Sequence, residues 1–322
     1  MATIVDVRGR RVWDSRGKAT VEADIVLEGG AIGRAIAPSG ASTGSGEAKV
    51  LDARRAAHHL NTEIRAALTG KEAQQESVDC TLIELDGTPD KHRLGANAIV
   101  AASLACAQAA AASAGVPLWQ HLAGGRRVAL PVPQIQIFGG GAHARGRVDV
   151  QDYLLVCTGA GSFAEALDWT AEVYRAAGAR LAKRGQLQGV ADEGGYWPSF
   201  KSNEEGLVEL VAAIEDAGLK AGADACIALD IAATQLFRGG RYHLALENRS
   251  LGSEQLLGML LRWIERYPIV SIEDPFAEHD TEAMRAFTRA AGERVQIVGD
   301  DFFVTDAKRV ANAAGACNAV LL

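Results

Sequence analysis

The sequence lacks the features that mark nucleic-acid-binding, secreted or membrane-spanning proteins. Its 33 Lys and Arg residues are outnumbered by 40 Asp and Glu, and no basic cluster interrupts the net charge of −7, which argues against a nucleic-acid surface. Its 5 cysteines form no C-x-x-C pair, and the N-terminus MATIVDVRGR lacks the apolar segment of a signal peptide. Residues 95–115 come near the composition of a membrane span, but their Ala, Ser, Asn and Gln content favours a buried helix. We therefore expect a cytoplasmic protein without nucleic-acid or membrane partners.

A glycine- and serine-rich stretch, APSGASTGSGE at residues 37–47, lacks the Gly-Lys-Ser/Thr ending of a phosphate-binding P-loop. It follows three β-like runs within residues 3–36, which predict an antiparallel meander. Helices are expected over residues 47–68 and 96–114. Residues 1–125 are therefore predicted to form an α+β domain with a flexible loop after its third strand.

From residue 126 to residue 322 the pattern changes to strands that alternate with helices. The strand-like runs, six in number, lie at residues 148–156, 189–195, 226–233, 269–275, 295–301 and 318–322. Repeated βα units of this length predict a parallel sheet covered on both faces, either a (β/α)8 barrel or a doubly wound sheet. Because a closed barrel needs eight strands, we expect the barrel domain to be incomplete in this chain.

Three consecutive apolar runs each end on an acidic residue: CIALD at Asp230, IVSIE at Glu273 and VQIVGD at Asp300. In a barrel these strand ends lie on one rim, the face at which active sites are built. A single acid after a strand is often only the N-cap of the next helix, but three in successive units are harder to explain in that way. Converging carboxylates repel one another unless a divalent cation neutralises them, and an all-oxygen set suits Mg²⁺ better than Zn²⁺. These residues are the candidate metal ligands.

Other polar residues fall on the same predicted rim. Glu193 lies in VADEGG, the end of the predicted strand at residues 189–195, and Gln151 and Asp152 lie on the preceding strand. Acids beside a metal are candidates for proton transfer, which favours catalytic roles for Glu193 and Asp152, although Asp152 could instead cap a helix or form a salt bridge. His143 lies in the glycine-rich loop GGGAHA, which lets its ring approach a ligand closely.

Several stretches of the chain together resemble the enolase family. They are DSRG (14–17), APSGASTG (37–44), GANA (95–98), DEGG (192–195), LDIAA (229–233), PIVSIEDP (268–275) and VGDD (298–301). Because they span nearly the whole chain in the family's order, the resemblance is much stronger than a single motif. It implies an α/β fold in which an enolase-type (β/α)8 TIM barrel at residues 126–322, whose first strands depart from simple βα order, follows an N-terminal α+β capping domain at residues 1–125.

The resemblance also implies an activity, the dehydration of 2-phosphoglycerate to phosphoenolpyruvate in glycolysis by a Mg²⁺-dependent lyase. The three strand-end acids match the ligands of a tightly held Mg²⁺. Glu193 matches the acid that assists departure of the C3 hydroxyl, and His143 and Gln151 match substrate-binding residues.

The loop after the third strand has a role in the family as well. Residues 37–46 match a lid in which Ser42 supplies oxygen ligands to a second Mg²⁺ that binds only with substrate. Glycines in such a loop serve closure over the site. The resemblance further implies a homodimer, with Arg16 and nearby residues as candidates for the interface.

Two departures from the family bear on the activity. The family's catalytic-strand glutamate is Asp152 here, one methylene shorter, and displacements of about 1 Å are costly in catalysis. The family continues past residues 318–322 into the lysine that acts as general base, so the chain of 322 residues by itself is expected to be inactive. The alternatives are an enolase homologue that acts on a phosphonate or carboxylated analogue, like carboxyphosphonoenolpyruvate synthase, and a non-catalytic binding protein on the same scaffold.

Overall fold

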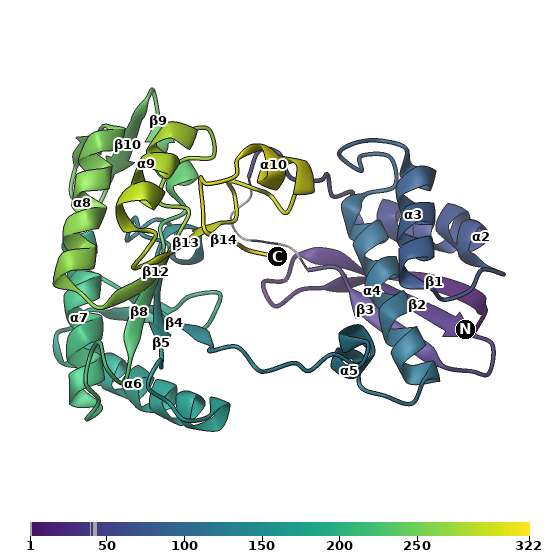
Figure 1. The fold of residues 1–322 in the computed structure, drawn as a ribbon, viewed down its shortest axis with the longest axis horizontal. Coiled ribbons are helices and arrows are strands. Elements are labelled where there is room, and N and C mark those ends of the chain that lie inside the picture. The colour runs from purple at the N-terminus through teal and green to yellow at the C-terminus, as the bar shows by residue number, and fades with distance from the viewer. Residues whose placement is uncertain (1, 39, 41–43) are drawn as a thin grey trace. The chain divides into compact units, whose positions relative to one another are not determined.

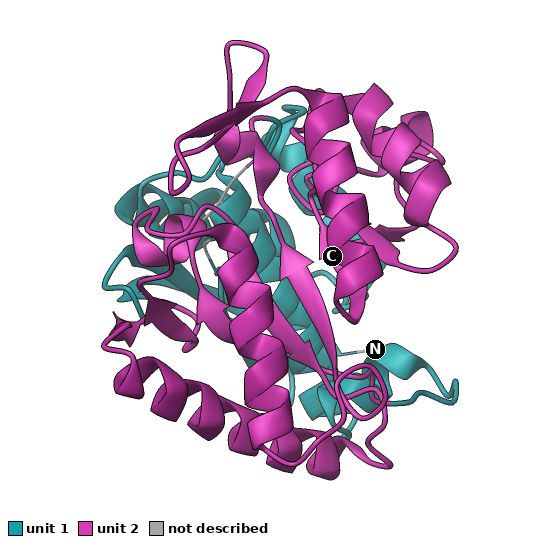
Figure 2. Ribbon diagram, turned by 90° about the vertical axis from the view of Figure 1, so that its left-hand side faces the viewer, with its two compact units in different colours: residues 1–40, 46–129 teal, residues 41–45, 130–322 magenta. Residues whose placement is uncertain are grey.

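The computed structural model of the chain describes residues 2–38, 40 and 44–322. The chain forms two compact units, which are coloured separately in Figure 2. Unit 1 consists of residues 1–40 and 46–129, and unit 2 consists of residues 41–45 and 130–322.

Unit 1 combines an antiparallel sheet with helices, as the sequence predicts (Figure 1). Its strands follow the order β1-β2-β3 and span Ile4–Trp13, Ala19–Leu27 and Ile32–Ile36. Its helical segments are α1 (Ala53–His59), the π-helical turn η1 (Leu60–Ile64), α2 (Arg65–Leu68), α3 (Gln75–Asp86), α4 (Ala96–Ser113) and α5 (Leu118–Ala123). The predicted meander and the predicted helix α4 are confirmed.

The first helix of unit 1 begins later than expected, so that prediction was wrong at its start. Helix α1 starts at Ala53 because the Asp52 carboxylate accepts hydrogen bonds from backbone N–H groups of the first turn and so forms the N-cap. Within the segment expected to be helical, Lys49 instead donates its backbone N–H to the carbonyl oxygen of Asp90 and accepts from the N–H of Ala96. These non-local bonds hold the segment before α1 out of helical geometry.

Helix α4 is the core helix of unit 1. Among the described residues it is the one helix long and apolar enough to cross a membrane, yet 56% of its apolar window is buried inside the protein. It packs against β2 and β3, and it approaches Gly33 of β3 so closely that a Cβ added there would lie 2.0 Å from the carbonyl oxygen of Ala105. Such close packing is typical of a helix in a protein core, which is what its composition favours.

Unit 2 is built on an eight-stranded sheet with the order β14-β13-β12-β8-β5-β4-β7-β6 (Figure 1). In chain order its strands are β4 (Gln134–Gly139), β5 (Asp152–Val156), β6 (Leu187–Val190), β7 (Tyr196–Pro198), β8 (Cys226–Asp230), β12 (Ile269–Glu273), β13 (Gln296–Gly299) and β14 (Ala319–Val320). Strands β8, β12, β13 and β14 run parallel to one another. They form the parallel part of the sheet that the sequence predicts.

Helices alternate with these strands, and a smaller sheet is inserted after β8. The helical segments are the 3-10 turn η2 (Gly141–Ala144), α6 (Phe163–Lys183), α7 (Asn203–Asp216), the 3-10 turn η3 (Ala233–Leu236), α8 (Ser253–Arg266), α9 (Thr281–Ala291) and α10 (Ala307–Asn312). The smaller sheet has the order β11-β10-β9 and consists of β9 (Phe237–Arg238), β10 (Arg241–Leu244) and β11 (Arg249–Leu251). The sequence reasoning missed this sheet, because its strands are very short.

Strand β5 runs opposite to the direction that simple βα alternation predicts. It pairs antiparallel with both β4 and β8, and β4, which the sequence reasoning missed, precedes it across the turn η2. The reversal agrees with the departure from βα order that the resemblance implies. Because β5 is reversed, its first residue, Asp152, lies opposite Asp230 at the end of β8. A residue from the start of one strand thereby reaches the rim at which the parallel strands end.

Close packing against α7 fixes the position of β5. Tyr153, the second residue of β5, is fully buried, and its hydroxyl donates a 2.7 Å hydrogen bond to the carbonyl oxygen of Asn203. Gly206 of α7 leaves the space that this ring occupies, since a Cβ added there would lie 2.4 Å from Tyr153 Cε1. The contact holds Asp152, the neighbour of Tyr153, at a fixed height on the rim.

Substituting Gly206→Ala is expected to destabilise unit 2 by roughly 1–3 kcal/mol, because the added methyl group overpacks a ring that is fully buried. The matched control is Gly258→Ala in the interior of α8, where the new Cβ would meet only the flexible guanidinium of Arg262 at 3.5 Å. This control should be neutral or stabilise the protein by up to about 1 kcal/mol, since Ala has the higher helix propensity. Urea unfolding of both variants measures the difference, and equal stabilities would contradict the packing argument.

Candidate active site

Neighbouring strands of unit 2 carry the three strand-end acids. Asp230 ends β8, Glu273 ends β12, and Asp300 directly follows the last residue of β13. In the parallel register, Glu273 lies opposite Asp230 on one side and opposite Val298, two residues before Asp300, on the other. The structure thus places all three backbone positions along one rim of the sheet.

Burial and mutual repulsion raise the pKa values of these acids. Burial holds the pKa of Asp230 well above its ordinary value, and the nearby charge of Glu273 raises it further. Burial also raises the pKa of Glu273 to about 8, with repulsion from Asp274 and Asp300 contributing. The pKa of Asp300 is raised by burial. The rim therefore holds one buried acid, Asp230, and two half-buried acids, Glu273 and Asp300, whose ionised forms are disfavoured without a cation.

Asp274 organises the turn that carries Asp300. It follows Glu273, has a left-handed backbone conformation with φ of 40°, and is 2% exposed. Its carboxylate accepts hydrogen bonds from the backbone N–H groups of Asp300 at 3.1 Å and Asp301 at 2.7 Å. Burial raises its pKa to about 7. The sequence reasoning missed Asp274, although the adjacent acids in IEDP were a signal that could have found it.

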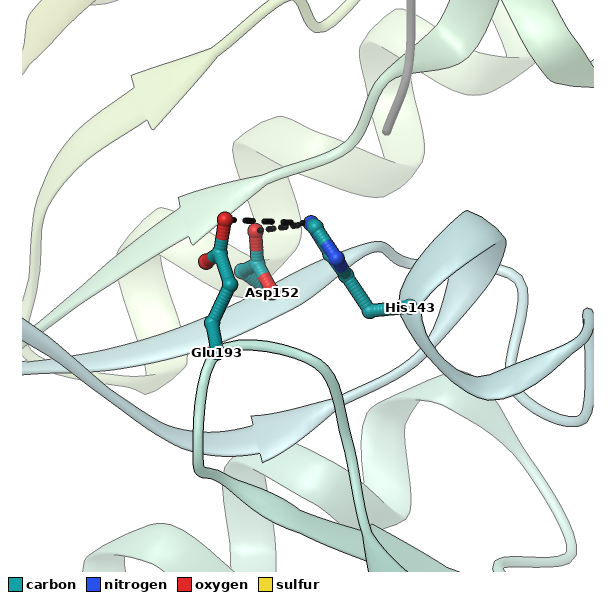
Figure 3. A group of neighbouring side chains, drawn as sticks. All are labelled: His143, Asp152 and Glu193. Carbon is teal, nitrogen blue, oxygen red and sulfur yellow. Dashed lines mark ion pairs between the residues drawn. The ribbon is translucent and has the colours of Figure 1, made fainter. Parts of the chain in front are cut away.

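A second group of side chains, His143, Asp152 and Glu193, converges from three segments of unit 2 (Figure 3). His143 lies on η2, Asp152 begins β5, and Glu193 lies on the turn after β6. His143 Nε2 is 3.5 Å from Glu193 Oε1 and 3.7 Å from Asp152 Oδ2. We call these three residues the histidine group. The structure therefore brings a predicted substrate residue next to both predicted proton-transfer acids.

The histidine group is asymmetric in its exposure. His143 and Asp152 are buried, whereas the side chain of Glu193 is 53% exposed. Burial raises the pKa of Asp152 to about 6, the charge of His143 opposes this shift, and repulsion from Glu193 adds to it. His143 Nδ1 is buried without a hydrogen-bond partner among the described residues, and the nearest acid to it is Asp192, whose Oδ2 is 3.9 Å away. An acid that titrates near pH 6 can exchange a proton under physiological conditions.

Gln136 of β4 links the parts of the histidine group. Its side chain is buried, and its Nε2 donates a short hydrogen bond to Asp152 Oδ1 and a longer one, 3.5 Å, to Glu193 Oε2. Its Oε1 accepts from the backbone N–H of Gly195 at 2.8 Å, which fixes the turn that carries Glu193. The sequence reasoning missed Gln136, because a polar residue within an apolar strand such as QIQIF gives no sign of its partners.

Replacing Gln136→Leu is expected to lower the stability of unit 2 by about 1–3 kcal/mol, because the Gly195 N–H and the Asp152 carboxyl lose a buried partner. The variant should also raise the pKa of Asp152 above its value of about 6, since the lost hydrogen bond favours the ionised form. The matched control is Gln134→Leu, an exposed position on the same strand. Urea unfolding and an NMR titration of the aspartate carboxyl carbons test both effects. An unchanged Asp152 titration would contradict the role given to Gln136.

Gln151 connects the strand-end acids to the inserted segment after β8. It is 3% exposed, and its Nε2 donates a 2.8 Å hydrogen bond to Asp230 Oδ2. Its Oε1 accepts from Gln235 Nε2 at 3.2 Å. Asp230 Oδ1 accepts from the backbone N–H of Ala232 at 2.8 Å, so both carboxylate oxygens of Asp230 are already oriented by donors. Gln151 thus positions a predicted metal ligand, and its predicted contact with substrate stays a prediction.

Two sets of residues could hold a metal ion. The donor atoms of the histidine group all lie within 4.8 Å of one another, and no other such group of three occurs in the part of the chain that the structure describes. Its imidazole nitrogen suits a transition metal, whereas Mg²⁺ prefers carboxylate oxygens. Asp230, Glu273 and Asp300 supply oxygens alone, and a divalent cation would offset the cost of ionising them away from water, so they fit Mg²⁺ chemically. Because their donor atoms do not all lie within 4.8 Å, joint ligation of one ion stays a prediction.

The predicted lid is described only in part. Ser42, the predicted ligand of a second Mg²⁺, lies outside the described residues. Further along the loop, the backbone N–H of Ser45 donates to the Glu278 carboxylate at 3.1 Å and 3.3 Å. A Cβ added to Gly44 would lie 2.8 Å from the carbonyl oxygen of Asp301. This end of the loop therefore packs beside the turn that carries the strand-end acid of β13.

Comparison with family models covers nearly the whole chain. Residues 127–322 match the model described as enolase, C-terminal TIM barrel domain, and residues 4–122 match the model described as enolase, N-terminal domain. The matches confirm the resemblance that the sequence motifs carry. They also confirm the expected architecture, an N-terminal domain followed by a TIM-barrel domain.

Proposed function

We propose, because this chain belongs to the enolase family, that it removes water from 2-phosphoglycerate to form phosphoenolpyruvate. The family's domains are those of Mg²⁺-dependent lyase-type enzymes. In the proposed reaction the C2–H and C3–O bonds break, a C2=C3 double bond forms, and the proton and the hydroxide leave as water. The observation that supports the proposal is the pairing of Asp152 with Asp230 across β5 and β8, because the proposed proton-transfer residue lies opposite a proposed metal ligand.

Glu193 is proposed to protonate the departing C3 hydroxyl. Its side chain is partly exposed, so a substrate can reach the carboxyl, and His143 and Asp152 lie next to it. Asp152, with a pKa raised to about 6, changes its protonation near neutral pH, as efficient general acids and bases do.

Asp230, Glu273 and Asp300 are proposed to hold Mg²⁺. When bound there, the metal supplies a Lewis acid that stabilises the extra negative charge on the substrate carboxylate, the role that metals have in the enolase superfamily. Gln151 keeps Asp230 in its ligating orientation through the 2.8 Å hydrogen bond to Oδ2. Asp274 does the same for the turn that presents Asp300.

A second candidate is a homologous reaction on a phosphonate or carboxylated analogue. The observation that favours it is the position of the Asp152 carboxyl, which is one methylene shorter than the family's glutamate and is held toward Gln136 and His143. A shorter side chain at this position would leave more room for a different substituent on the substrate. Substituting Asp152→Glu is therefore a direct probe of substrate preference.

The experiment measures binding and turnover of candidate substrates by the full-length protein. Calorimetry with 2-phosphoglycerate, and in parallel with the analogue in which a methylene replaces the ester oxygen, is carried out with Mg²⁺ and with EDTA. The proposal expects Mg²⁺-dependent binding of 2-phosphoglycerate and appearance of phosphoenolpyruvate. The Glu193→Gln variant should lose turnover and keep binding. Preference for the phosphonate would favour the second candidate. Binding of either ligand without turnover would identify a non-catalytic binding protein and overturn both.

A further inference from the structure

Unit 2 contains a cavity of about 390 Å³ that is lined in part by the turn η2. We call it the hairpin cavity. Its walls come from residues 141–149 after β4 and from the segment of η3, β9 and β10. Arg145, Arg238 and His243 supply its basic side chains. A cavity of this volume falls in the range of sites that bind small molecules.

The arginines of the hairpin cavity are not neutralised by acids. Neither Arg145 nor Arg238 forms an ion pair with a carboxylate among the described residues. The Arg145 guanidinium lies 5.9 Å from the centre of the Trp197 ring, a contact that orients it without cancelling its charge. His243 Nε2 is 3.1 Å from the carbonyl oxygen of Arg238, which ties the ring to β9. The cavity therefore presents positive charge with unused hydrogen-bond donors.

Asp149 is the one acid among the residues that line the hairpin cavity, and its carboxylate already accepts hydrogen bonds from other segments. This buried carboxylate accepts hydrogen bonds from the backbone N–H of Ala245 at 2.8 Å and of Leu246 at 3.2 Å. Asn203 Nδ2 donates a third hydrogen bond of 2.8 Å. Asp149 thus joins the end of β10 to the segment before β5 and holds the two walls of the cavity together, which makes the site preformed.

We propose that the hairpin cavity binds a small oxyanion that carries phosphate or carboxylate groups, held between Arg145 and Arg238. Guanidinium groups bind both kinds of oxyanion through paired, charge-assisted hydrogen bonds. The two arginines come from different segments, so an anion between them bridges the η2 turn and the β9–β10 hairpin. Anion binding here is independent of the reaction proposed for the rim, because none of these basic residues belongs to the histidine group or to the strand-end acids.

Binding in the hairpin cavity would reach the active-site rim through shared segments. Gly141 and Ala142 line the cavity, and the next residue along η2 is His143. Gln235 also lines the cavity, and its Nε2 donates to Gln151 Oε1. A bound anion therefore restrains two segments that position residues of the histidine group and of the strand-end acids.

The test is a titration of the full chain with inorganic phosphate, and in a second arm with malonate, in EDTA at constant ionic strength. Trp197 fluorescence reports the event, because the Arg145 guanidinium lies against its ring. We expect a saturable change for at least one anion, and calorimetry gives the affinity. The Trp197→Phe variant should lose the optical signal and keep the calorimetric one.

Variants at matched positions localise the binding. Arg145→Gln and Arg238→Gln should each weaken the anion about tenfold or more, and the double variant should abolish binding. The controls are Arg147→Gln, an exposed position two residues from Arg145, and Arg241→Gln, whose guanidinium donates to Ser250 outside the cavity. Both controls should bind like the parent protein. An absence of saturable binding of both anions, or equal weakening by the controls, would overturn the proposal.

Discussion

Replacing Glu273→Gln is expected to weaken Mg²⁺ binding by about 100-fold or more, because the amide removes one of the anionic oxygens that a hard divalent cation prefers. Glu273 is the central member of the strand-end acids, opposite Asp230 in the register and repelled by Asp300. Loss of its charge should therefore affect the ion more than loss of an acid at the margin. Calorimetric titration with Mg²⁺ in the absence of substrate gives the affinity directly.

The matched control for this substitution is Glu265→Gln, an exposed position on α8 that removes the same charge from the chain. It should bind Mg²⁺ as the parent protein does. An unchanged Mg²⁺ titration in Glu273→Gln would remove Glu273 from the ligand set. An equal loss of Mg²⁺ affinity in Glu265→Gln would show that the affinity depends only on the net charge of the chain.

In EDTA, the stability of unit 2 is expected to fall as the pH rises from about 4.5 to about 8. Burial raises the pKa of Glu273 from 4.5 to about 8, so within this window the folded state binds a proton that the unfolded state has released. Stability then decreases with pH, because the unfolded state binds fewer protons than the folded state. Asp274, raised to about 7, and Asp152, raised to about 6, act in the same direction. A pKa difference of one between the folded and the unfolded state corresponds to about 1.4 kcal/mol, so the total loss should amount to several kcal/mol.

Urea unfolding at pH 5, 6, 7 and 8 measures how the free energy of unfolding depends on pH. The Glu273→Gln variant should show a flatter profile, since an amide in this position does not titrate. Saturating Mg²⁺ should also flatten the profile in the parent protein, because a bound cation favours the ionised carboxylates. A stability that stays constant or rises from pH 5 to pH 8 in EDTA would show that these acids are not buried against one another.

Some residues of the candidate site could be predicted from the sequence, and others could not. Asp230, Glu273 and Asp300 could be found from the sequence because each ends an apolar run, and the end of a run is a local feature. Gln136 and Asp274 could not be assigned in this way, since their importance lies in hydrogen bonds to backbone and side chains of other segments. A local pattern carries no information about such partners.

The sequence by itself determined the class of each domain, the antiparallel meander of unit 1 and the acids that end β8 and β12. These follow from the period of apolar residues, which burial on one face or on both imposes on every strand and helix. Only the tertiary structure decided that β5 runs antiparallel between β4 and β8. The direction of a strand depends on which neighbours it pairs with, and this pairing joins residues far apart in the chain. It is that reversal which sets Asp152 opposite Asp230 and so completes the candidate site.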